Sequence, residues 1–290
     1  MKTLKKIVSN TLMLAALAVA PLSLADALVW QASVGDKTVY LAGTIHMLKP
    51  SDYPLPEEYE QVFAKADTIV LETDMQATQT PEFAMLMSQK MRLPAGQSLS
   101  TVLNEEVYAQ VQAAAEKRGL PLQALANYQP AFVALTLYVM ELQTLGFAEG
   151  VDAKYANKAS EAGKVLAALE TPEQQLGFML AMAELDANDF MRYSLADITT
   201  LPELMGQMVS AFKTGDAEML YRLGAEPMID YSRALYDTLL TERNQSWVAD
   251  IEGYLTTPET ELVMVGALHL AGPDGLPALL AQKGITVKRF

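Results

Sequence analysis

The chain has 290 residues, of which 51% are hydrophobic and 19% are charged, so it can bury a sizeable core and is too apolar to be intrinsically disordered. With 35 acidic and 21 basic residues, its net charge of −14 argues against nucleic acid and anionic membrane surfaces as partners. The chain contains no cysteine, which excludes disulfides, thiolate metal sites, cysteine nucleophiles and a lipidated N-terminal cysteine.

The first residues have the pattern of a secretory signal peptide. Three lysines precede an apolar run at residues 11–21, and Ser23-Leu24-Ala25 supplies small residues at the two positions that a signal peptidase reads. We therefore predict that residues 1–25 are removed and that the protein is periplasmic or secreted. Without the three lysines, 18 basic and 35 acidic residues remain, a net charge of −17. The apolar run is shorter than the roughly 20 residues of a bilayer span, so we expect no stable membrane insertion after cleavage.

Six short β-rich runs predict the strands of one sheet. They are residues 27–34, 38–42, 68–71, 164–169, 261–265 and 284–289. Residues 54–66 have acidic residues in their first turn and apolar residues at helical spacing, which predicts a helix that crosses between two neighbouring parallel strands. Thr171-Pro172-Glu173-Gln174 combines an N-cap, a proline at the first helical position and a capping-box glutamine, so a second helix is expected to begin there.

Two stretches of about ninety residues, 73–163 and 171–260, have almost no strand signal and are predicted to be helical insertions. Residues 131–142 are the most apolar part of the first insertion and are expected to form a buried core helix. The overall expectation is an α/β protein with a mixed, largely parallel central sheet and flanking helices. Residues 26–290 would form a single domain.

The only two histidines of the chain stand in matching contexts. Each is the fourth residue of a Gly-x-x-His segment, Gly43 to His46 and Gly266 to His269, and each segment follows an apolar strand. The two halves of the chain are therefore pseudo-symmetric. Glycine permits a sharp turn and a close backbone approach, so both histidines can point into the crevice beyond the strand ends. We predict that they share one site.

Two carboxylates occupy similar places at the ends of other strands. Glu72 follows the run at 68–71, and Glu170 follows the run at 164–169. Ligands of open parallel sheets bind beyond these carboxyl ends, so both glutamates are expected beside the histidines. The alternative for Glu72 is an acid at the sheet edge or a helix cap. For Glu170 it is a carboxylate placed favourably at a helix N-terminus.

Such a set of side chains has the chemistry of a hydrolase. Two imidazoles and a carboxylate can hold Zn²⁺, Mn²⁺ or a similar ion and leave a position for water whose pKa the ion lowers. The remaining carboxylate could take a proton from that water. Without a metal, a histidine paired with a glutamate could activate water directly.

Several further segments carry a resemblance to a known family. They are residues 39–46, 69–74, 150–152, 164–175, 243–244 and 265–275. Taken in this order, they make the chain resemble the TraB/GumN/Tiki-like proteins, which belong to a wider group related to erythromycin esterases and haem-binding ChaN proteins. The resemblance covers residues 28–290 and implies an αβα core that bears both Gly-x-x-His motifs.

The resemblance also implies a metal and a set of site residues. Members such as Tiki are divalent-metal peptidases, which implies His46, Glu72 and His269 as metal ligands, with Mn²⁺ or Co²⁺ as the first choice of ion and Zn²⁺ as the alternative. Glu170 and Arg243 are further catalytic candidates. Arg243 could orient a substrate carboxylate or stabilise developing negative charge, or it could be a charged residue near a helix end.

Asp152 is a weaker candidate for the site. It could be a site residue, but we expect it to cap a helix that begins at residue 153. This expectation rests on its position just before a stretch of helical composition.

The predicted function is that of an exported, metal-dependent hydrolase of the Tiki metallopeptidase type, which cleaves a peptide or amide bond in a peptide or small-molecule substrate. The chain has no His-Glu-x-x-His helix that would identify it as a peptidase by motif. Two alternatives remain. One is a metal-independent, esterase-like hydrolase with His46 as the general base, and the other is a protein that binds a peptide or haem without turnover.

Overall fold

The computed structural model describes residues 27–290, so the predicted signal peptide lies outside the described residues. All six predicted strands are confirmed, each within a few residues of its expected bounds. They are β1 (Val29–Val34), β2 (Lys37–Thr44), β3 (Thr68–Thr73), β4 (Val165–Glu170), β5 (Glu261–Gly266) and β6 (Thr286–Arg289).

The six strands form one sheet in the order β4-β3-β5-β2-β1-β6. The four strands β4, β3, β5 and β2 run parallel to one another, whereas β1 pairs antiparallel with both β2 and β6. This arrangement confirms the mixed, largely parallel sheet. The central strand β5 is buried along nearly its whole length, as expected where helices cover both faces of a parallel sheet.

The prediction that the helix at residues 54–66 joins two neighbouring parallel strands was wrong. Helix α1 (Glu57–Lys65) links β2 to β3, which are parallel but not neighbours. Strand β5 lies between them and pairs with both. The reason is topological, because β5 returns to the sheet after the second insertion and takes the central place that the local sequence around α1 cannot specify.

Both long insertions are helical, as predicted, and within the described residues neither contains a strand. The first comprises α2 (Met75–Thr78), α3 (Pro81–Lys90), α4 (Leu99–Val102), α5 (Glu105–Lys117), η2 (Leu122–Leu125), α6 (Pro130–Thr144) and α7 (Val151–Glu161). The second comprises α8 (Pro172–Ala181), η3 (Met182–Glu184), α9 (Ala187–Lys213), α10 (Ala217–Leu220), η4 (Tyr221–Ala225), α11 (Glu226–Tyr231), α12 (Arg233–Tyr236), η5 (Asp237–Thr241) and α13 (Glu242–Tyr254). The remaining helices are η1 (Pro50–Asp52), η6 (Ala267–Leu270) and α14 (Leu276–Gln282).

The helix start predicted at Thr171 is confirmed. The hydroxyl of Thr171 accepts from the Gln174 N–H, and the Gln174 side chain accepts from the Thr171 N–H, so the predicted capping box is confirmed at the start of α8. Two short segments, η4 and η5, are π-helical. Such wider turns are rare and are often found at functional sites.

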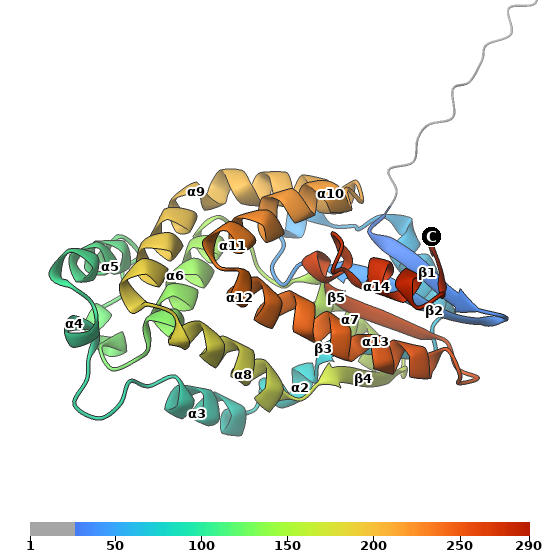
Figure 1. Ribbon diagram of the computed structural model, residues 1–290, viewed down its shortest axis with the longest axis horizontal. Coiled ribbons are helices and arrows are strands. Elements are labelled where there is room, and N and C mark those ends of the chain that lie inside the picture. The colour runs from blue at the N-terminus through green and yellow to red at the C-terminus, as the bar shows by residue number, and fades with distance from the viewer. Residues whose placement is uncertain (1–26) are drawn as a thin grey trace, which may run out of the picture.

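The sheet lies at one end of an elongated molecule, and α4, α5, α6, α8 and α9 extend to the other end (Figure 1). Each end has its own hydrophobic cluster. One surrounds the sheet, and the other is formed mainly by α5, α6 and α9. Helix α6 contributes buried Ala131, Val133 and Leu137, which confirms the predicted core helix. Among residues 27–290, no helix combines the length and the apolar character needed to cross a membrane.

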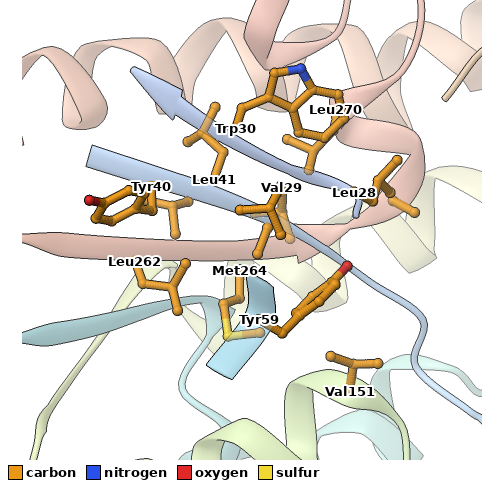
Figure 2. Close-up of a cluster of buried hydrophobic side chains, with 14 of the residues drawn as sticks. Leu28, Val29, Trp30, Tyr40, Leu41, Tyr59, Val151, Leu262, Met264 and Leu270 are labelled. Carbon is orange, nitrogen blue, oxygen red and sulfur yellow. The ribbon is translucent and has the colours of Figure 1, made fainter. Parts of the chain in front are cut away.

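The core around the sheet also fixes the position of the first Gly-x-x-His motif. Leu262 and Met264 of β5 lie on the face of the sheet that Tyr59 of α1 covers, whereas Leu41 of β2 lies on the opposite face (Figure 2). The buried Tyr59 hydroxyl donates a hydrogen bond of 2.8 Å to the carbonyl of Gly43. Packing of α1 against the sheet therefore fixes the carboxyl end of β2, where the first motif begins.

Candidate active site

The two Gly-x-x-His motifs lie side by side because β2 and β5 are parallel neighbours. Gly43 stands opposite Val265 in the ladder, and the next pair joins Thr44 to Gly266. The two glycines are thus offset by one residue. Both histidines follow the carboxyl ends of these strands, as the sequence predicts, but the offset places their glycines in different surroundings.

Gly266 faces a small hollow on which three site residues converge. A Cβ added to Gly266 would lie 3.1 Å from Glu72 Oε1, 3.6 Å from His269 Cδ2 and 3.8 Å from His46 Nε2. By contrast, a Cβ on Gly43 would clash with the side chain of Leu28, which belongs to the core. The first glycine therefore permits packing, and the second leaves space between the functional groups.

His46 is the exposed member of the site and is held by Asp152. Its side chain is 65% exposed, and its Nδ1 lies 3.2 Å from Asp152 Oδ2. Gly150 makes this contact possible, because a side chain there would clash with the backbone of Ile45 and His46, and the Val151 N–H donates to the Ile45 carbonyl. The first turn of α7 therefore packs directly against the backbone of the first motif.

The expectation that Asp152 caps a helix beginning at residue 153 was wrong. Helix α7 begins at Val151 with Gly150 as its N-cap, so Asp152 lies in the first turn with its carboxylate directed at the imidazole. Desolvation by the surrounding protein lowers the pKa of His46. The hydrogen bond to Asp152 and the negative charges of Asp152 and Glu72 outweigh this effect and raise the pKa to about 9.

His269 is buried and is held as a neutral imidazole by partners on both sides. The Asn244 amide nitrogen donates to the carbonyls of His269 and Asp274, so its Oδ1 is the acceptor for His269 Nδ1, 2.7 Å away. On the other side Arg243, which has no acceptor, lies 3.2 Å from Nε2. These partners select the Nδ1–H tautomer. Burial and the charge of Arg243 outweigh the charge of Glu72 and lower the pKa of His269 to about 3.

Arg243 is the hub of the buried part of the site. Its Nε and Nη2 donate to the two oxygens of Glu170 at 2.8 and 2.9 Å, and Nη2 also donates to Glu72 Oε2 at 2.7 Å. Its Nη1 donates to the Leu239 carbonyl and to His269 Nε2, both at 3.2 Å. All five N–H groups of the guanidinium are thus engaged within the protein. In this arrangement Arg243 positions its neighbours and has no donor left for a substrate.

Aromatic rings complete the surroundings of this guanidinium. The rings of Trp247 and Phe178 lie 4.7 and 4.9 Å from the Arg243 Cζ, within cation–π distance. Trp247 also contacts the His269 ring, with centroids 4.5 Å apart. The rings shield the charged cluster from water, which strengthens its electrostatic interactions.

The two glutamates are brought together by Arg243 but are not equivalent. Burial alone would raise the pKa of Glu72, but the neighbouring imidazoles, Arg243 and the Gly266 N–H, which donates to Oε1 at 2.6 Å, lower it to about 2. Burial raises the pKa of Glu170, and the hydrogen bonds from Arg243 only partly offset this effect. Glu72 is therefore a firmly ionised carboxylate that reaches the hollow, whereas Glu170 serves as a second anchor for Arg243.

The expected divalent metal fits this site in donor type but not in arrangement. Glu72 and His269 supply a carboxylate and an imidazole with Oε1 and Nε2 3.8 Å apart, and His46 Nε2 faces the same hollow. However, both Glu72 Oε2 and His269 Nε2 accept from Arg243. Within residues 27–290, no group of three or more His, Cys, Asp or Glu side chains is arranged to hold a metal ion. The metal ligand set stays a prediction from the sequence.

The structure brings all five predicted site residues into one cluster and adds others. His46, Glu72, Glu170, Arg243 and His269 are joined through the hollow and the guanidinium contacts described above. Sequence reasoning did not assign a role to Asn244 or Trp247. Trp247 lies one helical turn beyond Arg243 on the same face of α13, and this spacing was the available signal, whereas Asn244 is the next residue along and faces another direction.

Comparison with known proteins gives a consistent family match. The model of the TraB/PrgY/gumN family matches residues 28–289. The chain is 28% identical over 256 residues to the uncharacterized protein YbaP of Escherichia coli (strain K12), an alignment that covers 85% of this chain and 89% of YbaP. The uncharacterized protein YbaP of Shigella flexneri matches with the same identity and coverage. No solved structure matches the chain.

Proposed function

The chain belongs to the TraB/PrgY/gumN family, and we propose that it is an exported hydrolase that cleaves a peptide or amide bond with a water molecule held above Gly266. The hollow above Gly266 is the observation that supports this proposal. Glu72 Oε1 and His46 Nε2 both lie within 4 Å of the position that a Cβ on Gly266 would occupy. A water molecule placed between these two atoms, farther from the Gly266 Cα than a Cβ would lie, can donate one hydrogen bond to each acceptor and direct its lone pairs outward.

His46 is the residue that would take the proton. Asp152 accepts from Nδ1, which leaves Nε2 facing the hollow as the basic atom of the neutral ring. As the water oxygen bonds to the substrate carbonyl carbon, Nε2 takes the water proton. The imidazolium then gives this proton to the leaving nitrogen as the carbon–nitrogen bond breaks, which yields a carboxylic acid and an amine. The exposure of His46 gives a substrate access to this atom.

The buried cluster would hold the other half of the site in place. Ionised Glu72 orients the water and stabilises the imidazolium that forms on His46. Arg243 and the Gly266 N–H fix both oxygens of Glu72. Neutral His269 borders the hollow and is held by Asn244, so its ring does not compete for the proton.

This route needs no metal ion, and it corresponds to the metal-independent alternative drawn from the sequence. It applies equally to an ester bond, since the same water, base and proton transfer would serve an alkoxide leaving group. Metal-dependent hydrolysis stays a prediction. It requires Arg243 to release His269 Nε2, whereas loss of the His46 Nε2 proton is required by both routes.

Incubation of the purified chain with a peptide library and with acyl p-nitrophenyl esters, with and without EDTA, tests the proposal. We expect cleavage that persists in EDTA and is lost in His46→Ala and Glu72→Ala. Cleavage that requires added Mn²⁺, Co²⁺ or Zn²⁺ would support the metal-dependent form instead. No cleavage of any substrate, or haem binding with a Soret band and no turnover, would support a binding protein.

A further inference from the structure

A cavity of about 660 Å³ lies between the two helical insertions. Helices α6 and α9 form one side of it, and the π-helical turns η4 and η5 contribute to the other. Its size is in the range of pockets that bind small molecules or short peptide segments. Most of the lining is apolar, and Met182, Met208 and Met228 supply flexible side chains that can adapt to different shapes.

The cavity shares its wall with the candidate active site. Leu268 lines it and immediately precedes His269 in the second motif. Leu239 of η5 also lines it, and the Leu239 carbonyl accepts from Arg243. A Cβ added to Gly224 of η4 would lie 2.8 Å from the Leu268 side chain, so this π-helical turn packs directly on the motif. An occupant of the cavity would therefore lie next to the hydrolytic site.

One carboxylate in this apolar lining has no partner. Asp197 lies in the middle of α9 and is half-buried, and within the described part of the chain no cation or hydrogen-bond donor contacts its carboxylate. Tyr138 and Tyr193 line the same cavity. Burial, together with the charge of Asp197, raises the pKa of Tyr138 to about 12, so the phenol stays neutral beside the acid.

We propose that this cavity binds an apolar peptide segment that carries one positive charge, and that the charge pairs with Asp197. The proposal rests on the proposed function, since it identifies the cavity as the binding pocket for the part of the substrate beside the scissile bond. A cation would give the half-buried carboxylate the partner that it lacks and would lie beside the aromatic side chains of Tyr138 and Tyr193. The other charged residues of the lining, Arg222 and Glu203, already have partners in Glu218 and Gln207, so an anionic or neutral polar segment would gain neither interaction.

Binding of two matched peptides tests this pocket separately from turnover. The probes are the tripeptide amide Leu-Leu-Phe-NH₂ with a free amino terminus and its N-acetylated form, titrated calorimetrically at pH 7 into the His46→Ala chain so that cleavage does not interfere. We expect the free amine to bind at least tenfold more tightly. Asp197→Asn in the same background should reduce this ratio to about one, whereas Asp189→Asn, an exposed acid on the same helix outside the cavity, should preserve it.

A second variant guards against misfolding of Asp197→Asn. Ser194→Lys places an ammonium group one turn before Asp197 on the cavity side of α9, where it should compete with the free amine and reduce the ratio. Equal affinity for the two peptides, no binding of either, or a preference that survives both variants would overturn the pocket assignment. Binding without cleavage by the unaltered chain would leave the pocket standing and overturn the proposed function. Cleavage by the unaltered chain with no preference for the free amine would support the proposed function and overturn the pocket assignment.

Discussion

The Arg243 guanidinium donates to the Nε2 atom of His269 across 3.2 Å, and this contact makes the second histidine an acceptor. The first histidine has the opposite setting, since its Nδ1 faces the carboxylate of Asp152. Two motifs of identical spacing thus give one imidazole whose pKa is about 9 and another whose pKa is about 3. Groups whose surroundings push their pKa values apart are suited to different roles in one reaction.

The hollow above Gly266 can be tested by filling it. Gly266 has a backbone conformation that alanine can adopt, with φ −48° and ψ 136°, so Gly266→Ala introduces no backbone strain. Its methyl group would lie 3.1 Å from Glu72 Oε1 and narrow the space proposed for the attacking water. We expect kcat/KM to fall by about 10²-fold or more, with little change in Tm.

Gly253→Ala is the matched control for this substitution. Gly253 lies in α13 with nothing within 4 Å of an added Cβ. Alanine there should leave activity unchanged and stabilise the helix by roughly 0.5–1 kcal/mol. Full activity in Gly266→Ala would show that the hollow does not hold the nucleophile.

The His46–Asp152 pair predicts a specific pH dependence. Because neutral His46 is the base, kcat/KM should rise with pH with its inflection near pH 9, the pKa to which Asp152 raises the imidazole, and level off above it. In Asp152→Asn the main cause of the raised pKa is gone, so the inflection should move to lower pH, toward 6.5. NMR of the imidazole protons measures this directly, since the chain has two histidines. Unchanged midpoints in Asp152→Asn would contradict the pairing.

The sequence predicted the elements of the fold better than their order in space. All six strands and the capping box at Thr171 depend on neighbouring residues, so local patterns were sufficient. The position of β5 between β2 and β3 depends on pairing of Glu261 with both Thr68 and Val39, which lie 193 and 222 residues earlier in the chain. No local pattern near α1 predicts that β5 lies between these two strands.

The site shows the same division between local and distant information. Glycine spacing identified His46 and His269, and the strand ends identified Glu72, because each feature is local. The contact between Asp152 and His46 spans about a hundred residues and depends on Gly150 packing against the backbone of the first motif. Likewise, the saturation of Arg243 by acceptors from four elements is visible only when those elements are assembled.

Removal of Arg243 should destabilise the protein strongly. Arg243→Met leaves Glu72 and Glu170 buried without their countercharge, a loss of about 3–5 kcal/mol for a broken buried ion pair. The loss should shrink at low pH, where both carboxylates can be protonated. Urea unfolding at pH 7 and pH 4.5 measures both effects. Arg192→Met, which breaks an exposed pair with Asp189, should cost less than about 1 kcal/mol, and equal losses in the two variants would show that the Arg243 cluster is not a stabilising hub.

The neutral state of His269 predicts a loss of stability in mild acid. The folded-state pKa of about 3 lies below the ordinary value of 6.5, so between these values the unfolded chain binds a proton that the folded protein does not. The stabilisation due to neutral burial is therefore complete above pH 6.5 and is lost as the pH falls. The slope from this one group approaches about 1.4 kcal/mol per pH unit below 6.5. Glu72 contributes in the same direction, but only below its ordinary pKa of 4.5.

Between pH 6.5 and 4.5 the pH dependence of stability therefore includes the contribution of His269 but not that of Glu72. In His269→Gln no titrating ring remains, so the free energy of unfolding should fall less steeply across this window than in the unaltered chain, whatever its value at pH 7. His46→Gln is the matched control, since the raised pKa of His46 places its own effect between pH 6.5 and 9, where stability is lost as the pH rises. Urea unfolding at half-unit pH intervals gives both slopes. If His269→Gln and the unaltered chain have the same slope below pH 6.5, the buried imidazole is charged in the folded protein, and its assignment as the acceptor for Arg243 is wrong.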